Sequence, residues 1–345
     1  MDLFLRYTAG MEMRQQSSQK AGRRRRSVAL PWEDRKVAER LMLLDTPSLY
    51  FRAFYGLPDS LKAPNGMPVN AVRGLLDMIA RLVTDYEPTH LVACWDDDWR
   101  PQWRVDLIPS YKEHRVARKV SGGPDVEETP EGLVAQLPLI REVLAALAAP
   151  VIGAADHEAD DVIGSLASQA TTPVDIVTGD RDLFQLVDDD TRVRVLYTAR
   201  GMSRLEAVTD VTVVEKYRVL PGQYADFAAL RGDASDGLPG VPGIGDKTAA
   251  SLLREFVDLD GIIEASTDPS SAMSASVRQK ITAASDYLAI APTVVGVVRD
   301  LDLGHFDAQI RPLDAAKEET LKKLAADWNL GGAADRVLKA YAARG

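Results

Sequence analysis

Short, nearly continuous apolar runs alternate with longer amphipathic segments over residues 40–210. The runs have the length of buried strands, and we expect strands at Leu41–Leu44, His90–Trp95, Val151–Ile152, Val174–Thr178 and Val193–Tyr197. The segments between them repeat their apolar residues at helical spacing, over 69–86, 133–148 and 157–169. Strands that alternate with helices predict an α/β domain with a mostly parallel central sheet flanked by helices.

The pattern changes on both sides of this domain. Residues 1–39 are polar, contain the basic run Arg23–Arg26 and show no apolar period, so we expect a basic, disordered tail. Such a segment is either a solvated or misassigned start, or an arm that touches nucleic acid. After residue 210 the strands stop, and short helical segments continue to the end. The sequence therefore predicts two folded parts, 40–210 and 211–345, behind the tail.

Composition narrows the class of protein. With 46% hydrophobic residues among 345, the chain can bury a sizeable core. Its single cysteine, Cys94, excludes a disulfide scaffold and a metal cage made of thiolates. No apolar stretch reaches about 18 residues, and no apolar segment follows the basic N-terminus as it would in a secretory signal. These features predict a cytoplasmic protein without a membrane span.

The net charge of −10 is unevenly distributed along the chain. Residues 1–44 carry ten basic and five acidic residues, so the rest of the chain has a net charge of −15. An acidic body disfavours general attraction to a polyanion. It does permit clustered carboxylates that bind cations next to local basic patches.

Acidic residues follow three of the predicted strands. Asp45 and Asp96 come directly after a strand, and Asp180 and Asp182 follow a third strand across a glycine turn. Because the carboxyl ends of parallel strands meet at one edge of a sheet, we expect these side chains to lie close together. One such aspartate is usually a helix cap or a turn residue. Four acids on three strands are much harder to explain by capping alone.

Other acids are expected near the same edge. Glu158, Asp160 and Asp161 open a predicted helix, where the helix dipole already favours acids, but Glu158 and Asp161 also share a face. Asp233 and Asp236 lie in a turn-rich loop. Crowded carboxylates repel one another without cations, and oxygen-only ligands favour Mg²⁺ or Mn²⁺. Two such ions support phosphodiester cleavage, although phosphatases and other metal hydrolases use similar sets.

Residues 99–119 reverse the local charge. They hold six basic and two acidic residues, with Trp99, Trp103 and Tyr111 between them. Such a stretch can neutralise phosphates while its rings stack on unpaired bases. The alternative is an exposed helix whose basic side chains cover partly buried rings.

The segment Leu238–Ala249 is rich in glycine and proline. Gly240, Gly243 and Gly245 permit a tight turn between two short helices, the second of which begins at Asp246. Free amides at the start of that helix can bind a DNA phosphate without reading the base sequence. The spacing does not match a P-loop, and no strand precedes the segment.

Five acidic motifs, in their order along the chain, resemble those of the 5′-nuclease (flap endonuclease) superfamily. The motifs are Leu44-Asp45, Trp95-Asp96, Glu158-Ala159-Asp160-Asp161, Thr178-Gly179-Asp180-Arg181-Asp182 and Gly232-Asp233-Ala234-Ser235-Asp236. The chain looks most like the bacterial type found as the N-terminal domain of DNA polymerase I, here standing alone. The resemblance covers roughly residues 41–300. It implies a PIN-like nuclease core, a helical arch over about 99–130 and a helix-hairpin-helix (H3TH) region over about 232–256.

The resemblance implies a structure-specific 5′ nuclease with 5′-3′ exonuclease and flap-endonuclease action in replication and repair. Its substrates would be DNA with 5′ flaps, nicks, gaps or 5′ ends, and RNA–DNA primers. A monomer is expected. Two alternatives stay open at this point: a catalytically idle DNA-junction binding protein and a PIN-like ribonuclease.

The resemblance also implies two or more divalent ions, Mg²⁺ or Mn²⁺. One ion would be held by Asp45, Asp96, Glu158 and Asp160, and another by Asp180, Asp182 and Asp236. Asp161 and Asp233 would act directly or through water. In the run Asp96–Asp98, Asp97 is an alternative ligand to Asp96.

Other residues are implied to meet the substrate. Lys112 and Arg104 would steady the scissile phosphate, and Tyr111 would stack on the unpaired 5′ end. DNA contacts are expected from Arg115, Gly240, Gly243, Gly245 and Lys247. The backbone carbonyls of Val241 and Ile244 would bind a monovalent cation such as K⁺.

Overall fold

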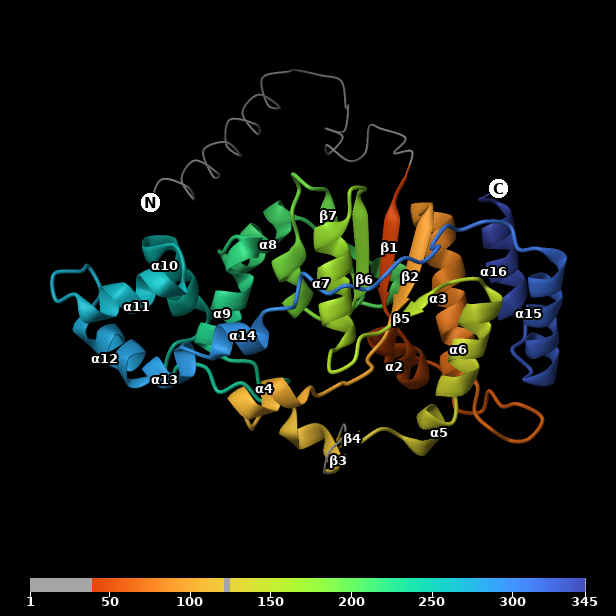
Figure 1. Cartoon of the computed structure of the whole chain (residues 1–345), viewed down its shortest axis with the longest axis horizontal. Helices are drawn as coiled ribbons and strands as arrows, with labels where there is room; N and C mark the ends of the chain where they lie inside the picture. The colour runs from red at the N-terminus through yellow and green to blue at the C-terminus, as the bar shows by residue number, and fades with distance from the viewer. Residues whose placement is uncertain (1–38, 121–124, 345) are drawn as a thin grey trace, which may run out of the picture. The chain divides into compact units, whose positions relative to one another are not determined.

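A six-stranded sheet organises the larger part of the chain in the computed structural model, which describes residues 39–120 and 125–344 (Figure 1). Its order is β5-β2-β1-β6-β7-β8, in which the first five strands are parallel and β8 runs antiparallel to β7. The strands are β1 (Leu41–Asp45), β2 (His90–Cys94), β5 (Val151–Ile152), β6 (Val174–Thr178), β7 (Val193–Tyr197) and β8 (Glu206–Val208). The mostly parallel sheet is confirmed, whereas β8 was not predicted. The expected tail, residues 1–38, lies outside the described residues.

The burial of the strands explains why their apolar runs are continuous. All five residues of β6 are buried, as are all but the first residues of β1 and β2. This is the pattern of a parallel sheet with helices on both faces. The helices of this part are α2 (Thr46–Gly56), α3 (Asn70–Tyr86), α5 (Glu131–Val134), α6 (Leu137–Ala146), α7 (Ala159–Gln169), α15 (Ala315–Asp327) and α16 (Ala333–Ala342).

Helix α3 is a central packing element beside the sheet. It contacts α2 and α16, and its buried stripe includes Leu75, Leu76 and Ile79. The C-terminal residues Leu321 and Val337 belong to the same hydrophobic core. None of the helices within the described ranges is long and apolar enough to cross a membrane.

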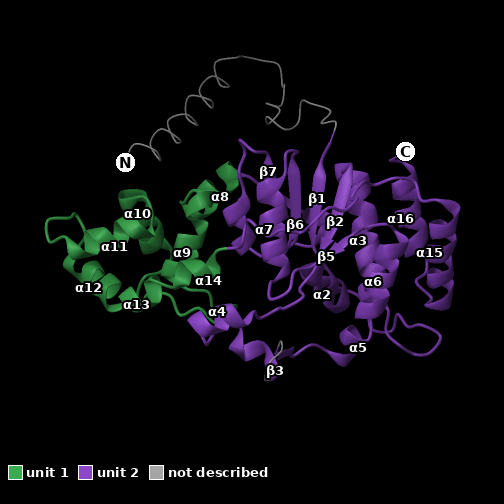
Figure 2. Cartoon of the chain, in the orientation of Figure 1, with its two compact units in different colours: residues 1–38, 210–296 green, residues 39–209, 297–345 purple. Residues whose placement is uncertain are grey.

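The described chain divides into two compact units (Figure 2). One contains residues 39–209 and 297–344, and the other contains residues 210–296. The sequence indicated a change near residue 210 but not the return at 297, because the helices after 297 have no pattern that separates them from those before it. The smaller unit is therefore inserted into the larger one.

The named elements of the inserted unit are all helices. Its elements are α8 (Asp210–Tyr217), α9 (Tyr224–Arg231), α10 (Asp246–Phe256), α11 (Leu259–Thr267), α12 (Ala275–Ala283), α13 (Ser285–Leu288) and α14 (Ala291–Val295), with the short 3₁₀ helix η4 (Pro221–Gln223). The glycine-rich segment lies between α9 and α10, where the sequence places a hairpin between two helices.

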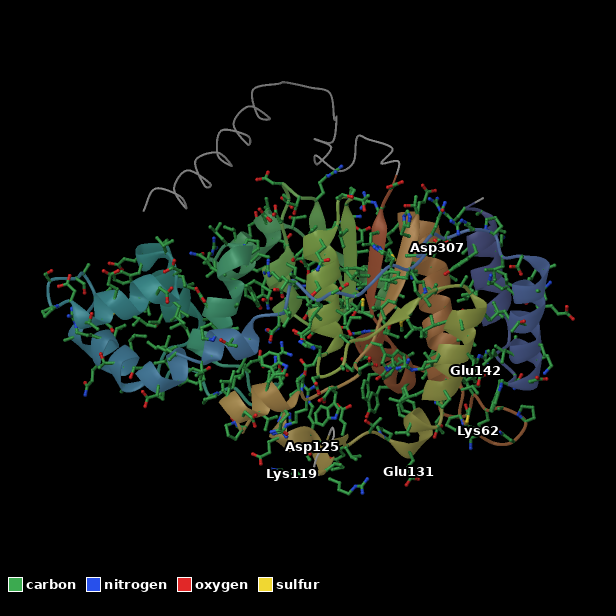
Figure 3. The ribbon with its side chains drawn as sticks, viewed as in Figure 1. Lys62, Lys119, Asp125, Glu131, Glu142 and Asp307 are labelled. Atoms are coloured by element: carbon green, nitrogen blue, oxygen red, sulfur yellow. The ribbon has the colours of Figure 1, made fainter. Side chains whose placement is uncertain are left out.

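The segment expected to form a helical arch is only partly helical. Within its described residues it contains α4 (Gln102–Leu107), a 3₁₀ turn η1 (Glu113–Arg115) and the antiparallel pair β3 (Val116–Arg118) and β4 (Val126–Glu127). Proline at 109 and left-handed backbone at Lys112 end the helix early. Lys119 and Asp125, labelled in Figure 3, flank the four residues 121–124 that the structure does not describe.

A buried cluster of charged side chains connects three segments of the larger unit at the amino end of the sheet. Asp175, the second residue of β6, is fully buried. Its carboxylate accepts from Arg40 Nη1 at 2.8 Å and from Arg194 Nε and Nη2 at 2.7 and 3.2 Å. The cluster joins the start of β1 to β6 and β7 on the opposite edge from the strand-end acids.

We predict that Asp175→Asn lowers the free energy of unfolding by about 3 kcal/mol, because it leaves two arginines beside a neutral group. Asp85→Asn is the matched control, since Asp85 pairs with Arg81 on the exposed face of α3. Its effect should stay below about 1 kcal/mol. Urea unfolding followed by circular dichroism measures both, and equal losses would show that the buried cluster contributes no more than a surface pair.

Candidate active site

Strand β1 places Asp45 at the carboxyl edge of the sheet. Its carboxylate caps α2, accepting from the Ser48 backbone N–H at 3.1 Å, and accepts from the Thr178 hydroxyl at 2.5 Å. Asp45 is buried, and this burial together with the charges of Asp96 and Asp180 raises its pKa to about 7. The hydrogen bonds fix the carboxylate, while the neighbouring acids make its ionised form costly.

Asp96 and Asp97 follow β2 and have different surroundings. Asp96 is half-buried and accepts from the Ala159 N–H at 2.7 Å. Burial and the charge of Glu158 raise the pKa of Asp96 to about 6. Asp97 is exposed, and its carboxylate lies 3.7 Å from the guanidinium of Arg141. The structure therefore favours Asp96 over Asp97 as the residue that joins the other acids.

The first turn of α7 supplies three acids in different environments. Glu158 and Asp161 form a capping box, and both are buried. Burial and the charges of Asp45 and Asp180 raise the pKa of Asp160 well above its usual range. Asp161 behaves in the opposite way: burial alone would raise its pKa, but hydrogen bonds and charge from Arg104 hold it below the usual value. Asp160 therefore shares the crowded edge, and Asp161 has a cation of its own.

The turn after β6 positions Asp180 and Asp182. The backbone N–H of Asp180 donates to the Thr178 hydroxyl oxygen at 2.8 Å, and Asp180 Oδ1 accepts from the Asp182 N–H at 2.9 Å. Asp180 is exposed, and Asp182 is buried at the start of the 3₁₀ helix η2 (Asp182–Leu186). Thr178 thus connects this turn directly to Asp45, although the sequence analysis did not single it out.

Five acids form what we call the carboxylate group: Asp45, Asp96, Glu158, Asp160 and Asp180. The charges of these acids raise the pKa values of Asp45, Asp96 and Asp160, so the five are close in electrostatic terms. Across residues 39–120 and 125–344, no three His, Cys, Asp or Glu side chains already form a metal-binding group. The oxygen-only donors and the repulsion among them fit a hard divalent cation such as Mg²⁺ or Mn²⁺.

Three donors from residues 104–112 converge on Glu158. Its carboxylate accepts from Tyr111 Oη at 2.9 Å, from Lys112 Nζ at 2.8 Å and from Arg104 Nη1 at 3.2 Å. Tyr111 is only 3% exposed, so its ring is not open to a base in this arrangement. Arg104, Tyr111 and Lys112 therefore face the carboxylate group instead of solvent. Contact between Tyr111 or Lys112 and DNA would require an exchange of partners.

Arg104 and Asp161 form a buried, two-pronged ion pair. Arg104 Nη1 and Nη2 donate to the two oxygens of Asp161 at 2.8 and 2.7 Å, and Arg104 is 2% exposed. Asp161 Oδ1 also accepts from the Val298 N–H at 2.9 Å. This geometry differs from the expectation that Arg104 meets phosphate and Asp161 meets metal. Both side chains are directed inward because each satisfies the other's charge.

Glu127 is a further acid near the site that the sequence analysis missed. Burial raises the pKa of Glu127, while the charges of Arg115 and Lys112 oppose the shift. Arg115, expected to contact DNA, is half-buried beside it. Only the pairing of β3 with β4 brings Glu127 to this place, so no local sequence signal could have identified it.

Asp233 and Asp236 lie in the inserted unit, in the loop after α9. Asp233 is buried, its Oδ1 accepts from the Ser235 N–H at 2.9 Å, and its Oδ2 lies 3.2 Å from Arg231 Nη2. Asp236 is half-buried. Asp233 therefore shapes its own loop, and a role for either residue as a metal ligand stays a prediction.

The hairpin between α9 and α10 depends on two backbones crossing closely. Gly240 has φ +66°, and a Cβ placed on it would lie 2.4 Å from the Gly232 nitrogen. Next to this crossing, the Val241 N–H donates to the Leu230 carbonyl at 2.9 Å. A side chain at position 240 would therefore collide with backbone.

The rest of the hairpin is more open. Gly245 has nothing within 4 Å of an added Cβ, and Lys247 is exposed in the first turn of α10. Lys280 Nζ donates to the Gly243 carbonyl at 3.0 Å. Val241 and Ile244 have buried side chains, and the Val241 carbonyl accepts from the Ile244 N–H at 2.9 Å. Binding of a monovalent cation by these carbonyls stays a prediction.

Two family models cover most of the chain. One described as the 5′-3′ exonuclease N-terminal resolvase-like domain matches residues 40–218, and one described as the 5′-3′ exonuclease C-terminal SAM fold matches residues 219–318. A Streptomyces coelicolor protein named 5′-3′ exonuclease is 58% identical over 86% of this chain and 98% of its own length. A Mycobacterium tuberculosis protein of the same name is 47% identical over 87% and 97%.

Solved structures share the fold at low sequence identity. The bacteriophage T5 D15 flap endonuclease in a complex with DNA and metal ions has a TM-score of 0.59 and 19% identity, covering 88% of this chain and 99% of that one. The catalytic core of Rad2 with a DNA substrate has a TM-score of 0.54 and 15% identity, covering 87% and 91%.

We predict that Gly240→Ala lowers the free energy of unfolding by about 2–4 kcal/mol, from left-handed backbone and a backbone clash. Gly245→Ala is the matched control in the same hairpin and should lower it by less than about 1 kcal/mol, since only a cap preference is lost. Thermal and urea unfolding measure both variants. Equal stability of the two would show that the close backbone crossing is absent in solution.

Proposed function

The chain belongs to the 5′-3′ exonuclease family, and we propose that it is a structure-specific nuclease that hydrolyses DNA at or near 5′ ends, including flaps, nicks and gaps. The observation that carries the proposal is the carboxylate group, in which acids from β1, β2, α7 and the β6 turn share one sheet edge. The names of the 58% and 47% identical relatives support exonuclease action. The fold shared with the T5 D15 flap endonuclease supports flap cleavage, and the fold shared with the DNA-bound Rad2 core supports DNA binding.

Two divalent ions, Mg²⁺ or Mn²⁺, would activate water and neutralise charge on the reacting phosphate. We assign one ion to Asp45, Asp96, Glu158 and Asp160. We assign the other to Asp180 and Asp182, and the contributions expected from Asp236 and Asp233 stay predictions. Asp161 holds Arg104 in place, because both of its oxygens are already used by Arg104 and by backbone N–H groups.

Lys112 and Tyr111 would change partners when substrate and metal bind. A cation at Glu158 competes with the ammonium group of Lys112, which lies 2.8 Å from that carboxylate. Released from Glu158, Lys112 would lie beside the carboxylate group, where the scissile phosphate is proposed to bind. Tyr111, whose ring lies beside Lys112, would then be exposed to the unpaired 5′ end. Arg104 would position this segment through Asp161.

The inserted unit would hold the duplex backbone. Lys247, Gly245 and the first amides of α10 are exposed and can approach phosphate. Gly240 and Gly243 keep the hairpin compact, and Arg115 would add a contact from the larger unit. A monovalent cation at the carbonyls of Val241 and Ile244 would add positive charge to the same hairpin.

One product-length assay tests this function. The chain is incubated with a labelled double-flap DNA, the matching flapped RNA and single-stranded RNA, with Mg²⁺, Mn²⁺ or a chelator. We expect metal-dependent cuts at and near the DNA junction. Binding without cleavage would support the idle junction binder, and preferential cleavage of RNA would support the ribonuclease.

We predict that Asp96→Asn lowers the single-turnover cleavage rate about 10³-fold, because it removes charge from a metal ligand. Asp97→Asn should change the rate less than about threefold, since Asp97 faces Arg141 and solvent. Each variant replaces one carboxylate by an amide, and the two replaced residues are adjacent in the chain. Reversed effects would assign the ligand to Asp97.

We predict that Lys112→Ala lowers the single-turnover rate about 10²-fold while the Kd for flapped DNA changes much less, because the ammonium acts where charge develops. Lys119→Ala is the control, since Lys119 is exposed and pairs with Glu113 in the same segment. A loss of affinity with an unchanged rate would limit Lys112 to ordinary backbone contact.

A further inference from the structure

Three polar side chains converge on Gly179, in the turn between β6 and Asp180. A Cβ placed on Gly179 would lie 2.8 Å from Ser48 Oγ, 3.2 Å from Thr198 Oγ1 and 3.5 Å from Arg52 Nη2. Ser48 and Arg52 belong to successive turns of α2, and Thr198 directly follows β7. Only glycine allows these groups to approach the turn so closely.

Two of these groups lack the partners that buried polar atoms normally have. Thr198 is fully buried, and neither its Oγ1 nor the buried Nε of Arg52 has a hydrogen-bond partner anywhere in residues 39–120 or 125–344. Leaving such groups unsatisfied is unfavourable, and a buried orphan calls for an explanation. Arg52 Nε and Nη2 form one edge of the guanidinium. Arg194 uses the same edge to hold both oxygens of Asp175.

The surroundings of this turn connect it to the carboxylate group. Ser48 Oγ accepts from the Gly179 N–H at 3.0 Å, and the Ser48 N–H donates to Asp45. Asp180 is the next residue after Gly179. Arg52 is therefore a cation at the edge where the reacting phosphate is proposed to lie, and it forms no ion pair with an acid in residues 39–120 or 125–344.

We propose that Arg52, with the Thr198 hydroxyl beside it, binds a phosphate oxyanion next to the one that is cleaved. This inference rests on the proposed function. The paired N–H groups of an arginine match two phosphate oxygens, and such charge-assisted bonds are stronger than neutral ones. Asp45 and Asp180 repel any anion, so the site favours one that binds together with divalent cations, and in the proposed function that anion is a nucleic-acid phosphate. The ligand is therefore a phosphate, either in the DNA backbone or as a free monophosphate.

The first test is a binding experiment in which single phosphates of a flapped DNA are replaced by neutral methylphosphonates. Affinity is measured by fluorescence anisotropy with Ca²⁺ in place of the catalytic ion. Arg52→Gln should weaken binding of unmodified DNA about tenfold. One methylphosphonate should weaken binding of the native chain by the same factor and leave the Arg52→Gln variant unaffected. Additive losses at every position would overturn the proposal.

Arg81→Gln is the matched control, since Arg81 is exposed on α3 and pairs only with Asp85 among the described residues. It should bind like the native chain at every phosphate position. Arg52→Lys keeps the positive charge but lacks the paired N–H groups of the guanidinium. It should therefore recover only part of the affinity for flapped DNA that Arg52→Gln loses. Full recovery of affinity with lysine would exclude a contact in which two N–H groups of Arg52 bind two phosphate oxygens.

Thr198→Val separates this role from a structural one. Valine has the shape of threonine without the hydroxyl, so removing an unsatisfied buried group should raise or maintain the melting temperature. The same variant should weaken binding of flapped DNA about threefold. A lower melting temperature with unchanged DNA affinity would mean that an ordered water bridges Thr198 and Arg52, and no phosphate site would exist.

Competition by inorganic phosphate and by a nucleoside 5′-monophosphate identifies the source of the ligand. Loss of that competition in Arg52→Gln, without coupling to any backbone position, would assign the site to a free monophosphate product. Coupling to one backbone position assigns it to DNA. Because these measurements need no cleavage, they remain informative if the nuclease assay on the native chain fails, and the two failures can be told apart.

Discussion

Repulsion among like charges is the constraint on which the rest of this molecule depends. The sheet brings carboxylates from separate strands to one edge, and burial makes their ionised forms still less favourable. The fold manages this with hydrogen bonds that fix individual groups, such as those from Thr178 and Ser48 to Asp45. It also brings cations of its own, since Arg104 and Lys112 both reach Glu158. The repulsion that destabilises this edge is therefore also the source of the affinity for divalent metal that we propose for it.

The sequence predicted the structure correctly where a local pattern of residues is compatible with only one kind of structure. Continuous apolar runs followed by acids predicted the parallel sheet and the edge that carries Asp45 and Asp180, and the glycine-rich segment lies between two helices as expected. The role of a basic side chain could not be predicted in this way. Arg104 carries the same charge whether it faces phosphate or Asp161, and only the packed fold shows that it is 2% exposed. The convergence of Ser48, Arg52 and Thr198 on Gly179 was equally invisible, because these residues are brought together from three separate elements.

The segment expected to form a helical arch, about 99–130, contains less helix than its composition and the family resemblance predicted. Its aromatic and basic residues suggested one amphipathic stretch, but a proline at 109 and the left-handed backbone of Lys112 divide it into short pieces. The same backbone turn directs Tyr111 and Lys112 to one carboxylate. An irregular segment can place adjacent side chains on a single target, whereas neighbours along a regular helix diverge by about 100°.

The return of the chain at residue 297 has a mechanical consequence. A module joined by one linker can rotate about it, and its effective concentration at a second site depends on the length of that linker. The unit 210–296 is instead connected to the larger unit at both ends, through residues 209–210 and 296–297. A double connection removes much of the orientational freedom that a single one leaves. Part of the entropy cost of bringing the hairpin to a polymer that the larger unit already holds is then met during folding, before any ligand binds.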